Sequence, residues 1–71
     1  MESKIRLKVG QRIKELRLKL GFTQEKLAEK TGIDYKYLQK IEGKSPPNIK
    51  LETIEKLAKA FKVNLSKLLN F

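Results

Sequence analysis

The apolar residues of this chain recur at helical spacing from one end to the other. In the first segment Ile5, Val9, Ile13, Leu16 and Leu20 follow one another at intervals of three or four residues, which places them on one stripe of an α-helix. Sustained strict alternation and β-branched clusters bounded by turn residues, the signals of strands, are absent from the sequence. The sequence therefore predicts an all-α fold.

Glycines and capping residues divide the chain into five helices. Gly21 and Gly32 tolerate the left-handed conformation that often ends a helix, so they close the first and second segments. Thr23 and Asp34 have side chains that can cap the second and third helices. The Ser-Pro-Pro-Asn run at residues 45–48 predicts a loop before the fourth. We expect a first helix ending at Gly21, helices over residues 24–31, 34–43 and 51–61, and a short last helix after the cap Asn64.

Gly10 lies inside the first helical segment. An interior Gly costs about 1 kcal/mol relative to Ala, which weakens the helix before it. We therefore predict that residues 1–8 are an N-terminal arm or a helical extension and that residues 9–71 form the domain. A chain of 71 residues has room for a single domain.

The sequence contains no Cys and no His. This excludes zinc fingers, disulfide scaffolds, thiol nucleophiles and His-based acid–base sites. Two pairs of acids at helical spacing, Glu25 with Glu29 and Glu52 with Glu55, lie among Lys residues on predicted solvent faces. We therefore expect no enzyme, no cofactor and no metal site.

No apolar run approaches the roughly 20 residues that a membrane span requires, and the first four residues lack the apolar segment of a signal peptide. A basic amphipathic first helix could lie on a membrane surface, but the core needs its apolar stripe. We expect a cytoplasmic, nucleoid-associated protein.

The chain carries 17 Lys and Arg against 8 Asp and Glu, a formal net charge of +9 that favours a polyanionic partner. Four acids stand four residues before a basic residue, a spacing that predicts intrahelical ion pairs: Glu2–Arg6, Glu15–Lys19, Glu52–Lys56 and Glu55–Lys59. The basic residues outside these pairs include Lys4, Lys8, Arg12, Lys14, Lys36, Lys40 and Lys44. The excess charge is therefore predicted on the first and third helices and on the loop after the third.

Residues 24–43 have the spacing that two helices crossing at a sharp turn require. With Gln24 as the first position, Ala28 is fifth, where the helices come too close for a larger side chain, and Gly32 is ninth, in the turn. Core-facing apolar residues stand tenth, fifteenth and eighteenth: Ile33, Leu38 and Ile41. This is the spacing of a DNA-binding helix-turn-helix.

The same segment resembles the helix-turn-helix family of phage repressors and Cro proteins. The resemblance rests on Thr-Gln-Glu-Lys-Leu-Ala-Glu-Lys-Thr-Gly-Ile at residues 23–33 and Tyr-Leu-Gln-Lys-Ile-Glu at 37–42, and it extends to residues 13–17 and 51–61. It implies a compact five-helix, lambda-repressor-like domain and a sequence-specific, double-stranded DNA-binding transcriptional regulator. Such proteins usually act as symmetric dimers on pseudo-palindromic operators. The length of the chain also resembles that of the small controller proteins of restriction-modification systems.

The third helix has an exposed face without acids, opposite the side of Leu38 and Ile41. Lys can donate to guanine, Gln can bond adenine, and a Tyr hydroxyl can contact a base or a phosphate. The candidate base-reading residues on this face are Tyr35, Lys36, Gln39 and Lys40. The alternative is a merely solvated face.

Residues at the edges of the motif are candidate phosphate contacts. Gln24 begins the second helix, where free N–H groups favour a phosphate and the family often uses Gln; the alternative is satisfaction of the helix end. Family members often carry Tyr at the position of Tyr37, where it donates to phosphate; the alternative is packing against the loop. Lys44 and Ser45 follow the third helix and complete this set.

The resemblance also implies a partly buried ion pair between Arg17 and Glu42 that ties the first helix to the third. Glu42 is then a scaffold residue. Removing one partner is expected to cost on the order of 3 kcal/mol, because the other charge remains buried without a counter-ion.

The C-terminal segment is more apolar than a small monomer can bury completely, and dimers of the family use this end. The predicted dimer interface consists of Val63, Leu65, Leu68, Leu69 and Phe71. The alternative is that these residues only close the core. A second possible function is an antitoxin-type protein that binds DNA and a partner protein, although the chain offers little beyond residues 1–8 for such a partner.

Overall fold

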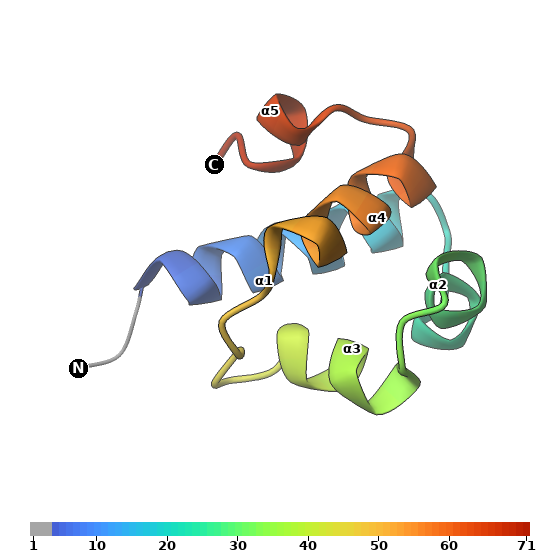
Figure 1. Ribbon diagram of the computed structural model, residues 1–71, viewed down its shortest axis with the longest axis horizontal. Coiled ribbons are helices and arrows are strands. Elements are labelled where there is room, and N and C mark those ends of the chain that lie inside the picture. Colours follow the sequence, from blue (N-terminus) through green and yellow to red (C-terminus); the bar gives the residue numbers. More distant parts are fainter. Residues whose placement is uncertain (1–3) are drawn as a thin grey trace.

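Five α-helices make up residues 4–71, the part of the chain that the computed structural model describes (Figure 1). They are α1 (Lys4–Lys19), α2 (Gln24–Thr31), α3 (Tyr35–Ile41), α4 (Leu51–Phe61) and α5 (Leu65–Leu68). The predicted all-α, five-helix fold is therefore confirmed. The third helix ends slightly before the expected Gly43, because the Gly43 N–H donates to the Lys40 carbonyl at 3.1 Å, in a tighter turn.

The helix ends have the caps that the sequence predicts. Side-chain oxygens of Thr23, Asp34 and Asn64 each accept a hydrogen bond from the backbone N–H three residues further on, at 3.0, 3.2 and 2.7 Å. Gly21 and Gly32 adopt the left-handed conformation, with φ of 75° and 74°. Local residues thus fix where these helices begin and end.

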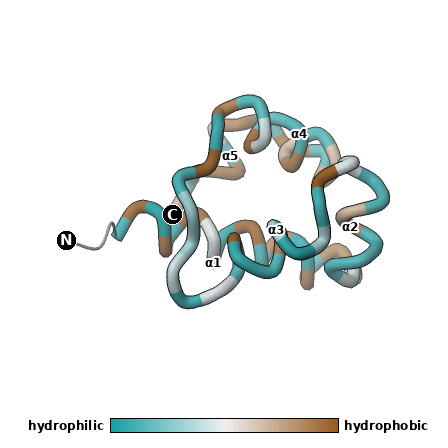
Figure 2. The backbone as a smooth tube through the Cα atoms, turned by 60° about the horizontal axis from the view of Figure 1, so that its bottom comes forward, coloured by the Kyte–Doolittle hydropathy of each residue, from teal (hydrophilic) through white to brown (hydrophobic). Residues whose placement is uncertain are grey.

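The core receives side chains from every helix. The largest completely buried side chains are Ile13, Leu27, Leu38, Ile41, Leu57 and Leu68. Hydrophobic and hydrophilic stretches follow one another along the helices, as expected when each helix buries one face (Figure 2). Burial of each such side chain contributes about 1.5–3 kcal/mol relative to exposure.

α1 and α4 run side by side through the middle of the molecule, with α3 below them and α5 above them in Figure 1. α2 packs against both α3 and α4, and α5 packs against α1 and α4. The predicted recognition helix and the apolar C-terminal segment therefore lie on different sides of the α1–α4 layer. Within residues 4–71, no helix is both long enough and apolar enough to cross a membrane.

At Gly10, α1 lies directly against the end of α3. α1 continues through Gly10 without a break, and this glycine is buried. A Cβ atom added there would collide with the Ile41 carbonyl oxygen and would lie 3.3 Å from Cγ of Pro46. Gly10 is therefore required by tertiary packing, a role that sequence reasoning missed when it treated the residue as a weak point of the helix. The division into residues 1–8 and 9–71 stays a prediction, and residues 1–3 lie outside the described part.

Candidate nucleic-acid interface

α2, the turn at residues 32–34 and α3 form a helix-turn-helix with a tightly fixed turn. The Gly32 N–H donates to the Ala28 carbonyl at 2.8 Å. The Thr31 hydroxyl donates to the Leu27 carbonyl at 2.8 Å and accepts from the Ile33 N–H at 3.2 Å. Sequence reasoning did not single out Thr31, because no local pattern distinguishes a bridging hydroxyl from an ordinary helix-end Thr. These bonds fix the angle at which α3 leaves α2.

α3 presents the predicted face to solvent. Its opposite side is anchored by Leu38 and Ile41, both completely buried. The four candidate base-reading side chains, Tyr35, Lys36, Gln39 and Lys40, are all exposed. Within residues 4–71 none of the four makes a side-chain hydrogen bond or ion pair with the rest of the protein. A rigid helix therefore carries four side chains whose polar groups are available to a ligand.

The flanking candidates differ in exposure. Lys44 and Ser45 are exposed on the loop after α3, and this loop is anchored by buried Pro46 against Gly10. Tyr37 is half-buried and packs against the core, whereas the alternative left open by the sequence was packing against the loop. Its assignment to phosphate stays a prediction.

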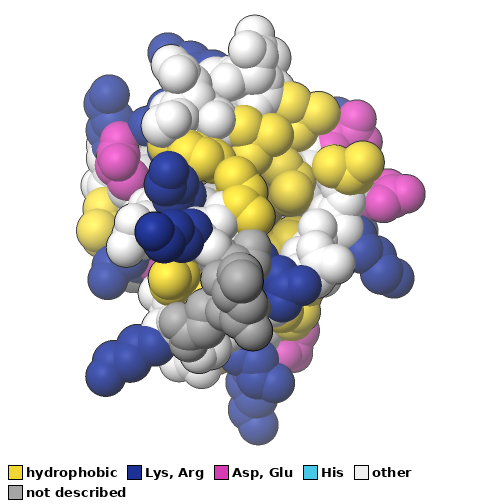
Figure 3. All heavy atoms as spheres, turned by 90° about the vertical axis from the view of Figure 1, so that its left-hand side faces the viewer, with side chains coloured by type: hydrophobic (Ala, Val, Ile, Leu, Met, Phe, Trp, Pro, Cys, Tyr) yellow, Lys and Arg dark blue, Asp and Glu magenta, His cyan; other side chains and the backbone are white. Residues whose placement is uncertain are grey.

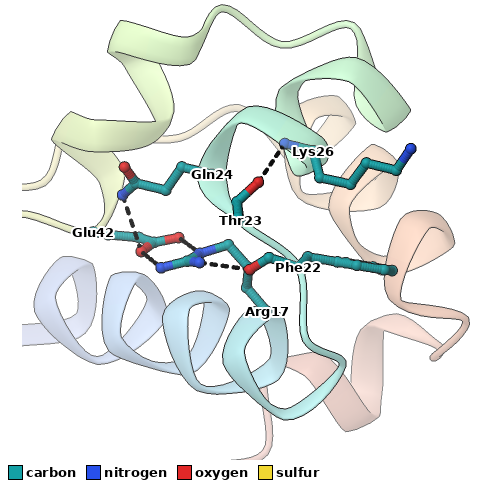
Figure 4. A network of polar contacts seen from close by, with 6 residues as sticks. All are labelled: Arg17, Phe22, Thr23, Gln24, Lys26 and Glu42. Carbon is teal, nitrogen blue, oxygen red and sulfur yellow. Dashed lines mark hydrogen bonds and ion pairs between the residues drawn. The ribbon is translucent and has the colours of Figure 1, made fainter.

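Arg17 and Glu42 form the ion pair that the family resemblance implies (Figure 4). Arg17 Nε donates to Glu42 Oε2 at 2.8 Å, and Nη2 donates to Oε1 at 2.9 Å, so the contact is bidentate. Nη1 donates to the Phe22 carbonyl at 2.7 Å. The two side chains are only 9% and 3% exposed. The pair thus joins α1, the segment before α2 and the end of α3.

The hydrogen bond to Glu42 raises the pKa of Arg17 above its ordinary value, and the negative charge of Glu42 acts in the same direction, while burial opposes both. Gln24 extends this network, because its Nε2 donates to Glu42 Oε1 at 3.2 Å (Figure 4). Sequence reasoning missed this partner of Gln24, because it lies 18 residues away. The bond directs the side-chain amide of the first α2 residue toward the end of α3.

The model of the helix-turn-helix domain family matches residues 10–70. The chain belongs to this family of DNA-binding transcriptional regulators.

Two curated relatives of this helix-turn-helix regulator are a control protein and a transcriptional regulator by name. The control protein C.BamHI of Bacillus amyloliquefaciens is 39% identical over 72 residues, which cover 100% of this chain and 88% of the relative. The HTH-type transcriptional regulator SinR of Bacillus licheniformis is 37% identical over 62 residues, and the match spans 87% of this chain but only 56% of SinR. The chain thus corresponds to about half of SinR and to most of C.BamHI.

Solved structures give the same result. The restriction-modification controller protein C.AhdI from Aeromonas hydrophila superposes with a TM-score of 0.82 at 38% identity, covering 89% of this chain and 94% of that one. SinR in complex with DNA superposes with a TM-score of 0.80 at 35% identity, covering 87% and 98%. The lambda-repressor-like fold of the helix-turn-helix regulator is therefore established.

The ion pairs of the regulator differ from the predicted ones. Among residues 4–71 the ion pairs are Arg12–Glu15, Arg17–Glu42 and Lys26–Glu29, at 2.7, 2.8 and 3.5 Å. The predicted pairs Glu15–Lys19, Glu52–Lys56 and Glu55–Lys59 are not among them, and Glu2 of the fourth pair lies outside the described residues. Exposed pairs of this kind contribute little to stability, so their formation is not strongly favoured at any one position. Lys and Arg side chains accordingly project from several parts of the surface (Figure 3).

The predicted dimer residues of the regulator fall into two groups. Leu68 is completely buried within the protomer, so its assignment to an interface is wrong, because the side chain closes the core. Val63 is half-buried against the same core. Leu65, Leu69 and Phe71 are 39%, 37% and 51% exposed. These three remain available to a second copy.

Proposed function

We propose that this protein is a sequence-specific, double-stranded DNA-binding transcriptional regulator that acts as a homodimer on a pseudo-palindromic operator in the cytoplasm. The observation that carries the proposal is the exposed, acid-free face of α3 on a helix anchored by Leu38, Ile41 and the Arg17–Glu42 pair. An α-helix with such a face fits the major groove, where bases present acceptors and donors to side chains.

The proposed contacts fall into two classes, base-reading contacts and phosphate contacts. Lys36 and Lys40 are the proposed readers of guanine, with Gln39 for adenine and Tyr35 for a base or a thymine methyl group. Gln24 stands at the first position of α2, where the backbone N–H groups are free, and is the proposed phosphate contact on one side. Lys44 and Ser45, with Tyr37, are the proposed contacts on the other side.

A restriction-modification system is the biological setting that we propose. Two relatives are controllers of this type by name, and C.BamHI aligns with the whole chain. The setting is tested by the genes beside this one: a restriction endonuclease and a methyltransferase gene next to it, with the selected operator in their promoter region, would support it. An operator found only at unrelated promoters would contradict it.

We expect Lys36→Ala and Lys40→Ala to relax base preference and to lose about 1–3 kcal/mol on the best site, because each removes a base contact. Gln24→Ala should weaken all sequences more evenly, since phosphates carry no base information. Bound duplexes are first selected from a random pool, which gives the half-site and its spacing, and affinities are then titrated on the selected and a random duplex.

Lys59→Ala is the matched control, because Lys59 is an exposed Lys on α4. It should leave base preference unchanged and lower affinity only slightly. Affinity of the wild type should fall steeply with salt. Equal losses on selected and random duplexes for Lys36→Ala, Lys40→Ala and Gln24→Ala would contradict the assignment of a reading face.

A dimer is expected at micromolar concentration, because one recognition helix reads only a few base pairs and two helices must reach successive major grooves about 34 Å apart. Leu69→Glu should dissociate it, since a carboxylate would lie in the apolar contact. Leu18→Glu is the control, because Leu18 is exposed to 58% on α1 outside the proposed contact. Sedimentation equilibrium measures the dimer Kd of the wild type and of both variants. A wild type that is monomeric at every concentration would refute the dimer.

A further inference from the structure

Arg12 connects α1 to the last turn of the chain. Its Nε donates to the Leu68 carbonyl at 3.2 Å, and its Nη2 donates to the Lys67 carbonyl at 2.9 Å. Its Nη1 pairs with Glu15 Oε1 at 2.7 Å, which orients the guanidinium, and the side chain is only 15% exposed. The sequence placed Arg12 outside the acid-first pairs four residues apart. The structure pairs it instead with Glu15, three residues further on, and its other acceptors lie 55 and 56 residues away.

α5 needs such support because it is a single turn. A helix of four residues, Leu65–Leu68, cannot recover the cost of nucleation from its own hydrogen bonds. The carbonyl groups at its end lack partners within the helix, although that of Lys67 also accepts from the Asn70 N–H at 3.3 Å. The buried side chain of Leu68 holds one side of the turn, and Arg12 holds two carbonyl groups with charge-assisted bonds. α1 therefore fixes the position of the C-terminal segment.

We propose that Arg12 is a positioning residue for dimerisation, acting through the C-terminal segment and not through contact with DNA. Leu65, Leu69 and Phe71, the exposed apolar residues of that segment, lie within four residues of the carbonyl groups that Arg12 binds. A surface that is already ordered in the free protomer loses less conformational entropy when a second copy binds. The inference rests on the proposed dimer and assigns to α1 a role in assembly.

Three variants of the full chain test this role. Arg12→Gln removes the charge-assisted bonds to both carbonyl groups, and Arg12→Lys keeps the charge but loses the planar fork. Glu15→Gln removes the ion pair while leaving the Arg12 nitrogens that bind Lys67 and Leu68 in place. Sedimentation equilibrium should show the dimer Kd raised about tenfold or more by Arg12→Gln. Arg12→Lys should give an intermediate value, and Glu15→Gln should stay within about threefold of the wild type.

A second measurement separates positioning from general loss of stability. Leu69→Ala is combined with Arg12→Gln, and all proteins are compared at a temperature at which circular dichroism shows them folded. If Arg12 acts through this surface, the fold-increase in the dimer Kd of the double variant should be smaller than the product of the fold-increases of the two single variants. A fold-increase equal to that product would overturn the inference.

The outcomes distinguish this inference from the function proposed above. A dimeric wild type with an equally dimeric Arg12→Gln variant overturns the role of Arg12 and leaves the dimer intact. A wild type that is monomeric at all concentrations overturns the dimer and this inference together. If Arg12→Gln does not fold, Arg12→Lys decides: a Kd raised about threefold or more supports the role, and an unchanged Kd overturns it.

Discussion

Arg17→Ala should lower the free energy of unfolding by about 3 kcal/mol. The substitution leaves the carboxylate of Glu42, 3% exposed, with Gln24 Nε2 at 3.2 Å as its remaining side-chain partner, and it removes the donor to the Phe22 carbonyl. A domain of this size has a total stability of the same order as this loss. Urea denaturation followed by circular dichroism measures the change.

Lys14→Ala is the control, because Lys14 is an exposed basic residue on the same helix, and it should change stability by less than about 0.5 kcal/mol. The double variant Arg17→Met/Glu42→Leu should recover much of the loss, since a buried pair replaced by apolar side chains of similar volume is often neutral. An Arg17→Ala midpoint equal to that of the wild type would show that the ion pair does not hold α1 to α3.

The contribution of the pair should be insensitive to pH in the neutral range. The pKa of Arg17 is raised in the folded state, so the part of the stabilisation that comes from its charge is complete below the ordinary pKa of Arg and is lost as the pH rises through the higher folded value. Only strongly alkaline solutions reach that range.

Gly10→Ala should destabilise the protein by about 2 kcal/mol or more, although Ala is the better helix former by about 1 kcal/mol. The added Cβ would meet the carbonyl oxygen of Ile41, which belongs to the backbone and cannot rotate away as a flexible side chain could. α1 and the end of α3 would have to separate. Urea denaturation measures the loss, and affinity for the selected duplex should fall as α3 shifts.

Gln11→Ala is the control for this substitution, because Gln11 is the adjacent and exposed residue of α1. It should be neutral or slightly stabilising. A Gly10→Ala protein that unfolds at a higher urea concentration than the wild type would mean that helix propensity prevails and that α1 and α3 do not make this contact.

Local features of the sequence were sufficient to predict the five helices, whereas their lambda-repressor-like arrangement was implied by the family resemblance. Thr23, Asp34 and Asn64 bond to N–H groups three residues away, so their effect on helix boundaries does not depend on the rest of the molecule. The apolar positions Leu38 and Ile41 are buried as the spacing predicts, and the exposed face of α3 follows from the helical period. The helical period also places the four candidate base-reading residues on this one face.

The tertiary structure decided the contacts between residues distant in the chain. Gly10 faces Ile41, Gln24 binds Glu42, and Arg12 binds carbonyl groups of the last turn. Leu68 is in the core although its neighbours are exposed. Residues 18 to 56 positions apart meet only after the helices have packed, and no local period encodes which backbone carbonyl a side chain will reach. The sequence alone therefore determined the five helices and the exposed face of α3, whereas the packing of α1 determined how α3 and α5 are held in place.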